Sequence, residues 1–274
     1  MKRVRVLRKK LYAYVMAIFI LVFSIYTVPA RIIDAGKKAY IVIIIDDFGY
    51  NGIGTDEMLE LEIPFTAAVL PFCEGTVDIC EKISEYNNYI DIIIHLPMEA
   101  KTGSRSWVGE KGIFSEMTDE QVRSIVRDAI EMVGCAIGVN NHMGSLIMED
   151  NNKMNIIMDV ISDNGLIFVN SKTTGDSTAK DVAKKYDISY YERVVFIDHS
   201  NDVSLVINQL KKAAEIALDE GYAVAIGHVG PAGGKTTIQG ILDVREELED
   251  MGIEFITLGE LDEILNGDYN FMFK

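Results

Sequence analysis

Eight short apolar runs, each rich in β-branched residues, recur along this chain. The runs occupy residues 41–46, 66–70, 90–95, 136–141, 166–170, 193–197, 223–228 and 253–257. Because they are apolar on both faces, they are typical of parallel strands covered by helices rather than of strands with one solvent-exposed face. This pattern restricts the chain to the α/β class of folds.

The segments between the runs have the spacing of amphipathic helices. The clearest spans residues 118–133, where apolar residues recur at i, i+3, i+4 and i+7 after a Thr118 and Gln121 capping box. Further helices are predicted at residues 55–62, 76–87, 152–164, 178–186, 203–220 and 237–251. We therefore predict a single distorted (β/α) barrel of seven or eight mostly parallel strands over residues 38–266.

The first 31 residues differ in composition from the rest. Seven basic side chains and no acidic one lie there, and residues 11–30 form an uncharged, mostly apolar stretch. About 20 apolar residues are enough to cross a bilayer, while the small residues near Pro29 suit a cleaved signal peptide. We expect a signal peptide or membrane anchor at residues 1–31, the length favouring the anchor. Either form places the remainder outside the cytoplasm and limits membrane contact to this segment.

The remainder of the chain is strongly acidic. It carries 19 basic against 42 acidic side chains, a net charge of −23. Such a body is repelled by phosphate backbones, which argues against nucleic acid as a partner.

All four histidines follow apolar runs. His95, His142, His199 and His228 each end such a run, and the run at 41–45 ends in Asp46 and Asp47. The ends of parallel strands meet at one mouth of a barrel, where such folds place their chemistry. His199 is the weakest candidate, because a cap of the next helix explains it.

Several of these residues suit a metal site. Of Asp46 and Asp47, one can bind a divalent cation while the other accepts a proton, although a capping role is the simpler explanation for an isolated pair. His95 and Glu99 offer a nitrogen and an oxygen ligand that suit zinc or a related metal. Alternatively Glu99 orients a ligand or binds a sugar hydroxyl.

Other polar groups point to substrate binding and proton transfer. Asn140 and Asn141 precede His142 in a segment denser in polar groups than packing requires. His228 can protonate a leaving group near neutral pH, or be a core histidine bonded to a carbonyl. The 21-residue connection 97–117 holds Trp107, the only tryptophan, which can stack on a sugar or anchor the loop.

With these residues in place, the chain resembles the divergent polysaccharide deacetylase family. The motifs that carry the resemblance are IIIDDFG at 43–49, FTAAVLP at 65–71, HLPME at 95–99, GVNNHMGS at 138–145, FVNSKTT at 168–174, RVVFID at 193–198 and IGHV at 226–229. The resemblance implies a distorted (β/α) barrel and metal-dependent hydrolysis of N-acetyl groups on a polysaccharide.

The resemblance also implies roles for single residues. Asp46 corresponds to the catalytic base, Asp47 to a metal ligand and His228 to a late catalytic histidine. The H-x-x-x-H ligand pair of the better-known deacetylases falls on His95 and Glu99, so the second histidine is replaced. The chain also lacks an Arg-x-Pro-Tyr motif, and Asn170 stands where this branch commonly has aspartate.

The leading hypothesis is an extracytoplasmic, metal-dependent carbohydrate deacetylase acting on a cell-wall glycan or other polysaccharide. Asp47, His95 and His142, with Glu99 as a further candidate, would hold a Zn²⁺-like ion, and Asp46 and His228 would transfer protons. Asn140, Asn141 and Trp107 are the predicted substrate-binding residues. The alternative is a barrel that binds a glycan or an envelope partner without turning it over.

Overall fold

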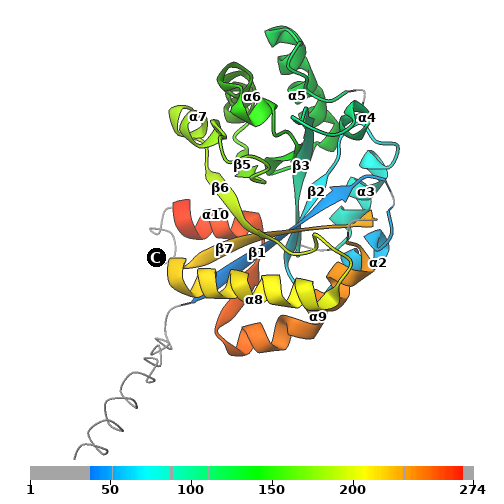
Figure 1. Ribbon diagram of the computed structural model, residues 1–274, viewed down its shortest axis with the longest axis vertical. Coiled ribbons are helices and arrows are strands. Elements are labelled where there is room, and N and C mark those ends of the chain that lie inside the picture. The colour runs from blue at the N-terminus through cyan, green and yellow to red at the C-terminus, as the bar shows by residue number, and fades with distance from the viewer. Residues whose placement is uncertain (1–37, 51, 87–88, 110, 231–232, 268–274) are drawn as a thin grey trace, which may run out of the picture. The chain divides into compact units, whose positions relative to one another are not determined.

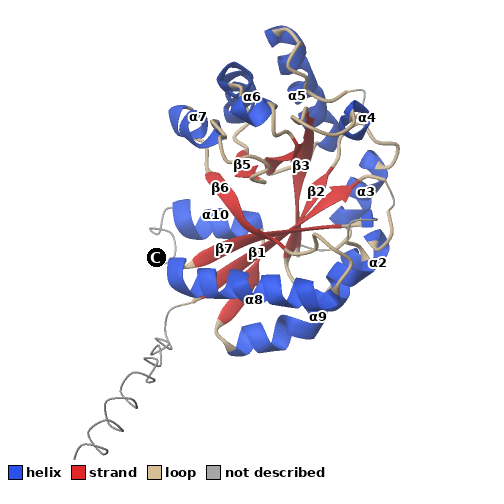
Figure 2. Cartoon of the chain, viewed as in Figure 1, coloured by secondary structure: helices blue, strands red, loops and turns tan. Residues whose placement is uncertain are grey.

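Eight parallel strands form one sheet at the centre of the molecule (Figure 2). The computed structural model describes residues 38–267 except 51, 87–88, 110 and 231–232. The strands are β1 (Ala39–Phe48), β2 (Phe65–Val69), β3 (Ile90–Met98), β4 (Gly138–Met143), β5 (Ile167–Asn170), β6 (Tyr190–Phe196), β7 (Tyr222–His228) and β8 (Ile253–Ile256). Each of the eight apolar runs thus corresponds to one strand.

Strand β1 closes the sheet into a barrel because it has three neighbours. It pairs with β7 over Tyr40–Asp46, while on its other side its first residues pair with β8 and its last with β2. Strands β1 to β7 therefore form a closed ring, and β8 is an extra strand beside the start of β1. The recorded strand pairs are all parallel, which confirms the predicted (β/α) barrel.

Helices surround the sheet (Figure 1). They are α2 (Thr55–Leu59), α3 (Thr76–Ser84), α4 (Arg105–Val108), α5 (Asp119–Val133), α6 (Asn151–Asp163), α7 (Ala179–Lys185), α8 (Val203–Glu220), α9 (Lys235–Asp250) and α10 (Leu258–Asn266), with a short 3₁₀ turn at Ile147–Glu149. The capping box predicted for α5 is present. Helices α4 and α10 were not predicted, and α2 is shorter than expected.

The apolar core has two parts. The larger lies between the strands and the helices, and the smaller fills the barrel interior with side chains such as Val42, Ile44 and Ile226. Towards the carboxyl ends of the strands the interior changes from apolar to polar, with Asp46, His95 and Asn140 all buried. Burying three such groups is costly unless they bond to one another or to a ligand.

The predicted signal peptide or anchor at residues 1–31 lies outside the described residues. Among the helices described from Lys38 onward, none combines the length and apolarity that a bilayer crossing requires. The N-terminal assignment therefore stays a prediction.

Candidate metal centre

A bulge at the end of β1 turns two adjacent carboxylates towards one site. The pairing of β1 with β2 shifts register between Ile45 and Phe48, and Asp47 has a φ of +71°. In a regular strand, neighbouring side chains point to opposite faces, so the bulge lets both carboxylates approach His95. Asp46 Oδ2 lies 3.6 Å and Asp47 Oδ1 3.4 Å from His95 Nε2.

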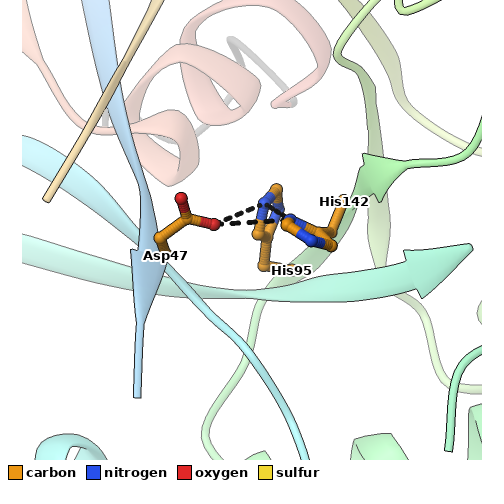
Figure 3. Close-up of side chains that lie close together, drawn as sticks. All are labelled: Asp47, His95 and His142. Carbon is orange, nitrogen blue, oxygen red and sulfur yellow. Dashed lines mark hydrogen bonds and ion pairs between the residues drawn. The ribbon is translucent and has the colours of Figure 1, made fainter. Parts of the chain in front are cut away.

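Asp47, His95 and His142 converge from β1, β3 and β4 (Figure 3). Asp47 Oδ1 lies 3.3 Å from His142 Nδ1, and that nitrogen lies 3.0 Å from His95 Nε2. Tetrahedral zinc with bonds of about 2.0–2.1 Å places its ligand atoms about 3.3–3.4 Å apart. The triangle formed by these three atoms is close to one face of such a tetrahedron, and the residues fit a divalent cation.

Hydrogen bonds on the far side of each imidazole fix which nitrogen faces the centre of the triangle. His95 Nδ1 donates to Asn140 Oδ1 at 2.7 Å, and His142 Nε2 donates to the Trp107 carbonyl oxygen at 3.2 Å. With these tautomers, the two inner nitrogens present lone pairs to each other. Asp47 Oδ1 is buried and makes no hydrogen bond to any described residue. Three acceptors facing one point require a cation or a proton between them.

The charges in this group shift its pKa values. Burial alone would raise the pKa of Asp47, but the adjacent His142 and His95 hold it well below its usual range. Burial would lower the pKa of His95, but Asp46 and Asp47 raise it. Asp47 is therefore ionised at neutral pH, which is the form that binds metals.

Asp46 occupies a different environment from its neighbour. It is buried, its Oδ1 accepts a hydrogen bond from Asn140 Nδ2 at 2.8 Å, and burial raises its pKa despite the nearby histidines. Asn140 thus links the carboxylate to the imidazole of His95. Both ends of its buried amide are engaged, so its prediction as a substrate-binding residue is not supported, and it positions the site instead.

Asn141 faces away from the cluster, as strand alternation requires. Its Oδ1 accepts from the Ser171 backbone N–H, and its Nδ2 donates to the Met143 carbonyl and to Thr173 Oγ1. With 1% of its surface exposed, it holds the ends of β4 and β5 together. The structure therefore gives no support to its predicted contact with substrate.

His228 forms a second polar group at the mouth, together with Asp198. The Asp198 carboxylate accepts from His228 Nδ1 at 2.9 Å, from the His228 backbone N–H at 2.6 Å and from Thr237 Oγ1 at 2.7 Å. Burial would lower the pKa of His228, but the bond to Asp198 and the charge of Asp46 raise it to about 9. The imidazole is therefore protonated at neutral pH.

Sequence reasoning missed Asp198 and noticed its neighbour instead. His199 is exposed, consistent with its lower ranking. The signal for Asp198 was its place directly after the sixth apolar run, equivalent to that of Asp46 after the first.

Glu99 is not part of the three-residue group. Its Oε2 accepts from the Ser115 backbone N–H at 2.7 Å, and its carbonyl oxygen accepts from the Leu146 and Ile147 N–H groups. These bonds fix the long connection between β3 and α5. The geometry assigns Glu99 to that role and does not support it as a metal ligand.

A cleft of about 420 Å³ opens beside the metal-site candidate. Asp47 and His142 form part of its wall, and Trp107, Tyr50 and Phe72 add aromatic side chains. The Asp47 and His142 side chains are 28% and 20% exposed, against 3% for His95. A ligand can therefore reach the three-residue group from this side.

Comparison with known proteins matches these motifs to one family. The model of the divergent polysaccharide deacetylases matches residues 43–261. The chain belongs to this family. The uncharacterized protein YibQ of Escherichia coli K12 is 30% identical to this chain over 213 residues. The match covers 78% of this chain and spans 65% of that relative's length.

Solved structures share the fold of this chain. The uncharacterized protein ATU2773 of Agrobacterium tumefaciens C58 has a TM-score of 0.74 at 16% identity, covering 82% of this chain and 89% of its own. The peptidoglycan N-acetylglucosamine deacetylase Bc1960 has a TM-score of 0.51 at 12% identity, covering 81% and 87%. At these identities the likeness concerns the fold alone.

Proposed function

We propose that this chain is a metal-dependent hydrolase that removes N-acetyl groups from an extracytoplasmic polysaccharide. The observation that carries the proposal is the triangle of Asp47, His95 and His142, with three acceptor atoms 3.0–3.4 Å apart. Membership of the divergent polysaccharide deacetylase family supports the choice of reaction.

The chain's own residues would hold the cation in a defined shell. Asp47 supplies a carboxylate oxygen, and His95 and His142 supply neutral nitrogens whose opposite N–H groups are already bonded. A divalent cation, with Zn²⁺ best suited to this ligand set, supplies a Lewis acid that polarises a carbonyl group and acidifies water. Asp47 and His142 line the cleft, so a cation held by these residues would be within reach of a substrate that enters it.

Asp46 is placed to accept a proton. It lies beside the metal ligands in sequence and space without being one of the three, and the Asn140 amide fixes its orientation. In the proposed reaction it takes the proton of the attacking water. A positioned general base of this kind contributes about 10²–10⁴-fold to a rate.

His228 is placed to return a proton. The backbone pairing sets it directly beside Asp46, and Asp198 holds its imidazole in the charged form. Amide hydrolysis needs an acid for the departing amine, because an unprotonated amide anion is a poor leaving group. His228 donates that proton in our proposal, and Asp198 orients it.

The substrate and location rest on separate observations. The aromatic side chains of the cleft suit the apolar faces of sugar rings. Trp107 and Tyr50 are the most exposed of these side chains, with 66% and 67% of their surface accessible. The basic and apolar residues 1–31 favour a position outside the cytoplasm.

The test is acetate release by the purified full-length chain from N-acetylated oligosaccharides, combined with elemental analysis. We expect about one divalent ion per chain, loss of acetate release after chelation and recovery when the ion is restored. Full activity without a metal, or no acetate from any N-acetylated glycan with the metal bound, would contradict the proposal.

The Asp46→Asn variant separates this proposal from glycan binding without turnover. Catalysis predicts that the variant still binds the glycan but releases no acetate, whereas the wild-type chain does both. Equal binding and no acetate release in both proteins would favour the binding barrel.

A further inference from the structure

Two of the three cysteines lie next to each other on neighbouring elements. Cys80 is on α3, and Cys135 follows the end of α5, which packs against α3. Their thiols share a hydrogen bond, although β3 and α5 separate them in the sequence. Neither thiol lines the cleft or belongs to the metal-site candidate, so the proposed reaction does not use them.

A tight turn after α5 places Cys135. Gly134 ends the helix with a φ of +60°, which glycine adopts without strain. The Cys135 backbone N–H then donates to the Val133 carbonyl oxygen at 2.6 Å, a bond between residues two apart that defines a γ-turn. Cys135 Sγ donates to the same oxygen at 3.1 Å. These bonds hold the thiol at a defined position beside α3.

The two thiols differ in exposure and in acidity. Cys80 is 8% exposed, whereas Cys135 is an exposed residue. The hydrogen bond from Cys80 lowers the pKa of the Cys135 thiol to about 7, while the same bond and burial raise the pKa of Cys80. Cys135 is therefore partly ionised at neutral pH and open to solvent, as a thiol must be to attack a disulfide. Cys80 is its protected neighbour.

The third cysteine has a different environment. The Cys73 thiol donates to the Pro71 carbonyl oxygen at 3.8 Å and shares a hydrogen bond with the Tyr50 side chain. It lines the cleft, away from the other two thiols. The structure therefore selects one pair out of the three that three cysteines allow.

We propose that Cys80 and Cys135 form a disulfide when the chain meets a disulfide oxidant, the kind of reagent found outside the cytoplasm. The Cys135 thiolate attacks one sulfur of the oxidant and releases the other as a thiolate. Cys80 passes its proton to that thiolate and attacks Cys135 Sγ, which expels the second half of the oxidant. Two protein thiols are oxidised to one cystine, and one oxidant disulfide is reduced to a thiol and a thiolate.

The bond would close a loop that contains β3 and α5 and ends just before β4. Strands β3 and β4 carry His95 and His142, so the crosslink would join the two segments that bring these imidazoles together. A disulfide that closes a long loop limits the freedom of the unfolded chain. We expect the oxidised chain to have a Tm about 5–15 °C above that of the reduced chain.

The test uses the purified full-length chain, first reduced and then exposed to oxidised glutathione without denaturant. Its intact mass should fall by two hydrogen atoms, and peptide mapping without reductant should show Cys80 linked to Cys135. Cys135→Ser changes an exposed residue and should form no internal disulfide. Cys73→Ser is the matched control, the same substitution at the remaining cysteine, and should form the bond as the wild-type chain does.

The Tm is measured with a chelator present, so that a bound metal does not contribute. A phosphine reductant should lower the Tm of the wild-type chain and of Cys73→Ser, and leave that of Cys135→Ser unchanged. Three free thiols after oxidation, glutathione retained on Cys135, or a bond that involves Cys73 would each overturn the proposal. Acetate release plays no part in this test, so the disulfide and the proposed reaction can fail independently.

Discussion

The two polar groups at the barrel mouth differ in how completely the protein satisfies them. Asp198 accepts three hydrogen bonds and makes an ion pair with His228. In the group of Asp47, His95 and His142, by contrast, three acceptors face one another, and Asp47 Oδ1 lies near both imidazoles without a hydrogen bond to any described residue. Both groups lie at the same end of the same barrel.

This difference separates two kinds of functional residue. A group that is complete within the protein can keep its own proton in place, as the raised pKa of His228 indicates. A group that is incomplete holds an unfavourable arrangement that a bound cation or an added proton relieves. We therefore expect metal removal to affect the first group little and the second strongly.

The largest expected effect is on the incomplete group. Asp47→Ala removes one of the three ligand atoms, and we expect acetate release to fall by at least about 10³-fold, because Lewis-acid activation is worth several kcal/mol. Elemental analysis should show the ion lost. Asp243→Ala, which removes an exposed carboxylate on α9, is the control and should retain both metal and activity.

Asp46→Asn tests whether Asp46, which lies between the two groups, acts as a base or as a metal ligand. We expect acetate release to fall about 10²–10⁴-fold with the metal content unchanged, because the residue lost is the base and not a ligand. Loss of the ion in this variant would instead place Asp46 in the metal shell.

Unfolding by urea in the presence of a chelator compares the two groups directly. Asp198→Asn should lower the free energy of unfolding by about 1–3 kcal/mol, because the new amide leaves buried donors without an acceptor. Asp47→Asn removes a charge that His142 and His95 stabilise, as its lowered pKa indicates, so this variant should lose stability as well. Replacing the chelator with Zn²⁺ should then raise the free energy of unfolding of the wild-type chain and of Asp198→Asn but not of Asp47→Asn, and equal stabilisation of all three would refute the comparison.

The pH dependence of kcat/KM tests the state of His228. The acid form is the active one, so activity should be present below a pKa of about 9 and lost as pH rises through it. The same proton stabilises the fold, a contribution that is full below about pH 6.5, the usual value for histidine, and lost as pH rises to about 9. In Asp198→Asn the fall of kcat/KM at high pH should begin at a lower pH, because the charge that raises the pKa of His228 is gone. A fall at the same pH as in the wild-type chain would mean that a group other than His228 causes it.

The smallest expected effect concerns the cleft wall. Trp107→Ala should raise KM about 2- to 10-fold, the range expected for one lost aromatic contact, and leave kcat and metal content unchanged. The backbone carbonyl that orients His142 remains in this variant. A fall in metal content would mean that the ring itself supports the site.

The barrel was predictable because its strands carry a local signal. Every apolar run became a strand within a few residues of its predicted bounds, since residues buried on both faces must be apolar whatever their neighbours. The order of the runs then brings Asp47, His95 and His142 to one end. Helix α10 also has a local signal, the capping box of Thr257 and Glu260 directly after the last apolar run.

The pairing of side chains at the mouth was harder to predict. Asn140 and Asn141 look alike in the sequence. Because side chains alternate between the two faces of a strand, Asn140 shares a face with His142 and Asn141 lies on the opposite face. The partner of His228 could not be found locally, because Asp198 lies 30 residues away and meets it only when β6 and β7 align. That Glu99 lies outside the three-residue group could not be predicted for a similar reason, because its partner Ser115 reaches it only in the folded connection.

The contact between Trp107 and His142 is made by the main chain, so its chemistry does not depend on which amino acid stands at position 107. Evolution can therefore exchange the ring that faces the cleft while the peptide group continues to orient the imidazole. In the proposed enzyme, glycan preference and metal retention would therefore be separately adjustable, and a library randomised at position 107 should yield new specificities without loss of the ion.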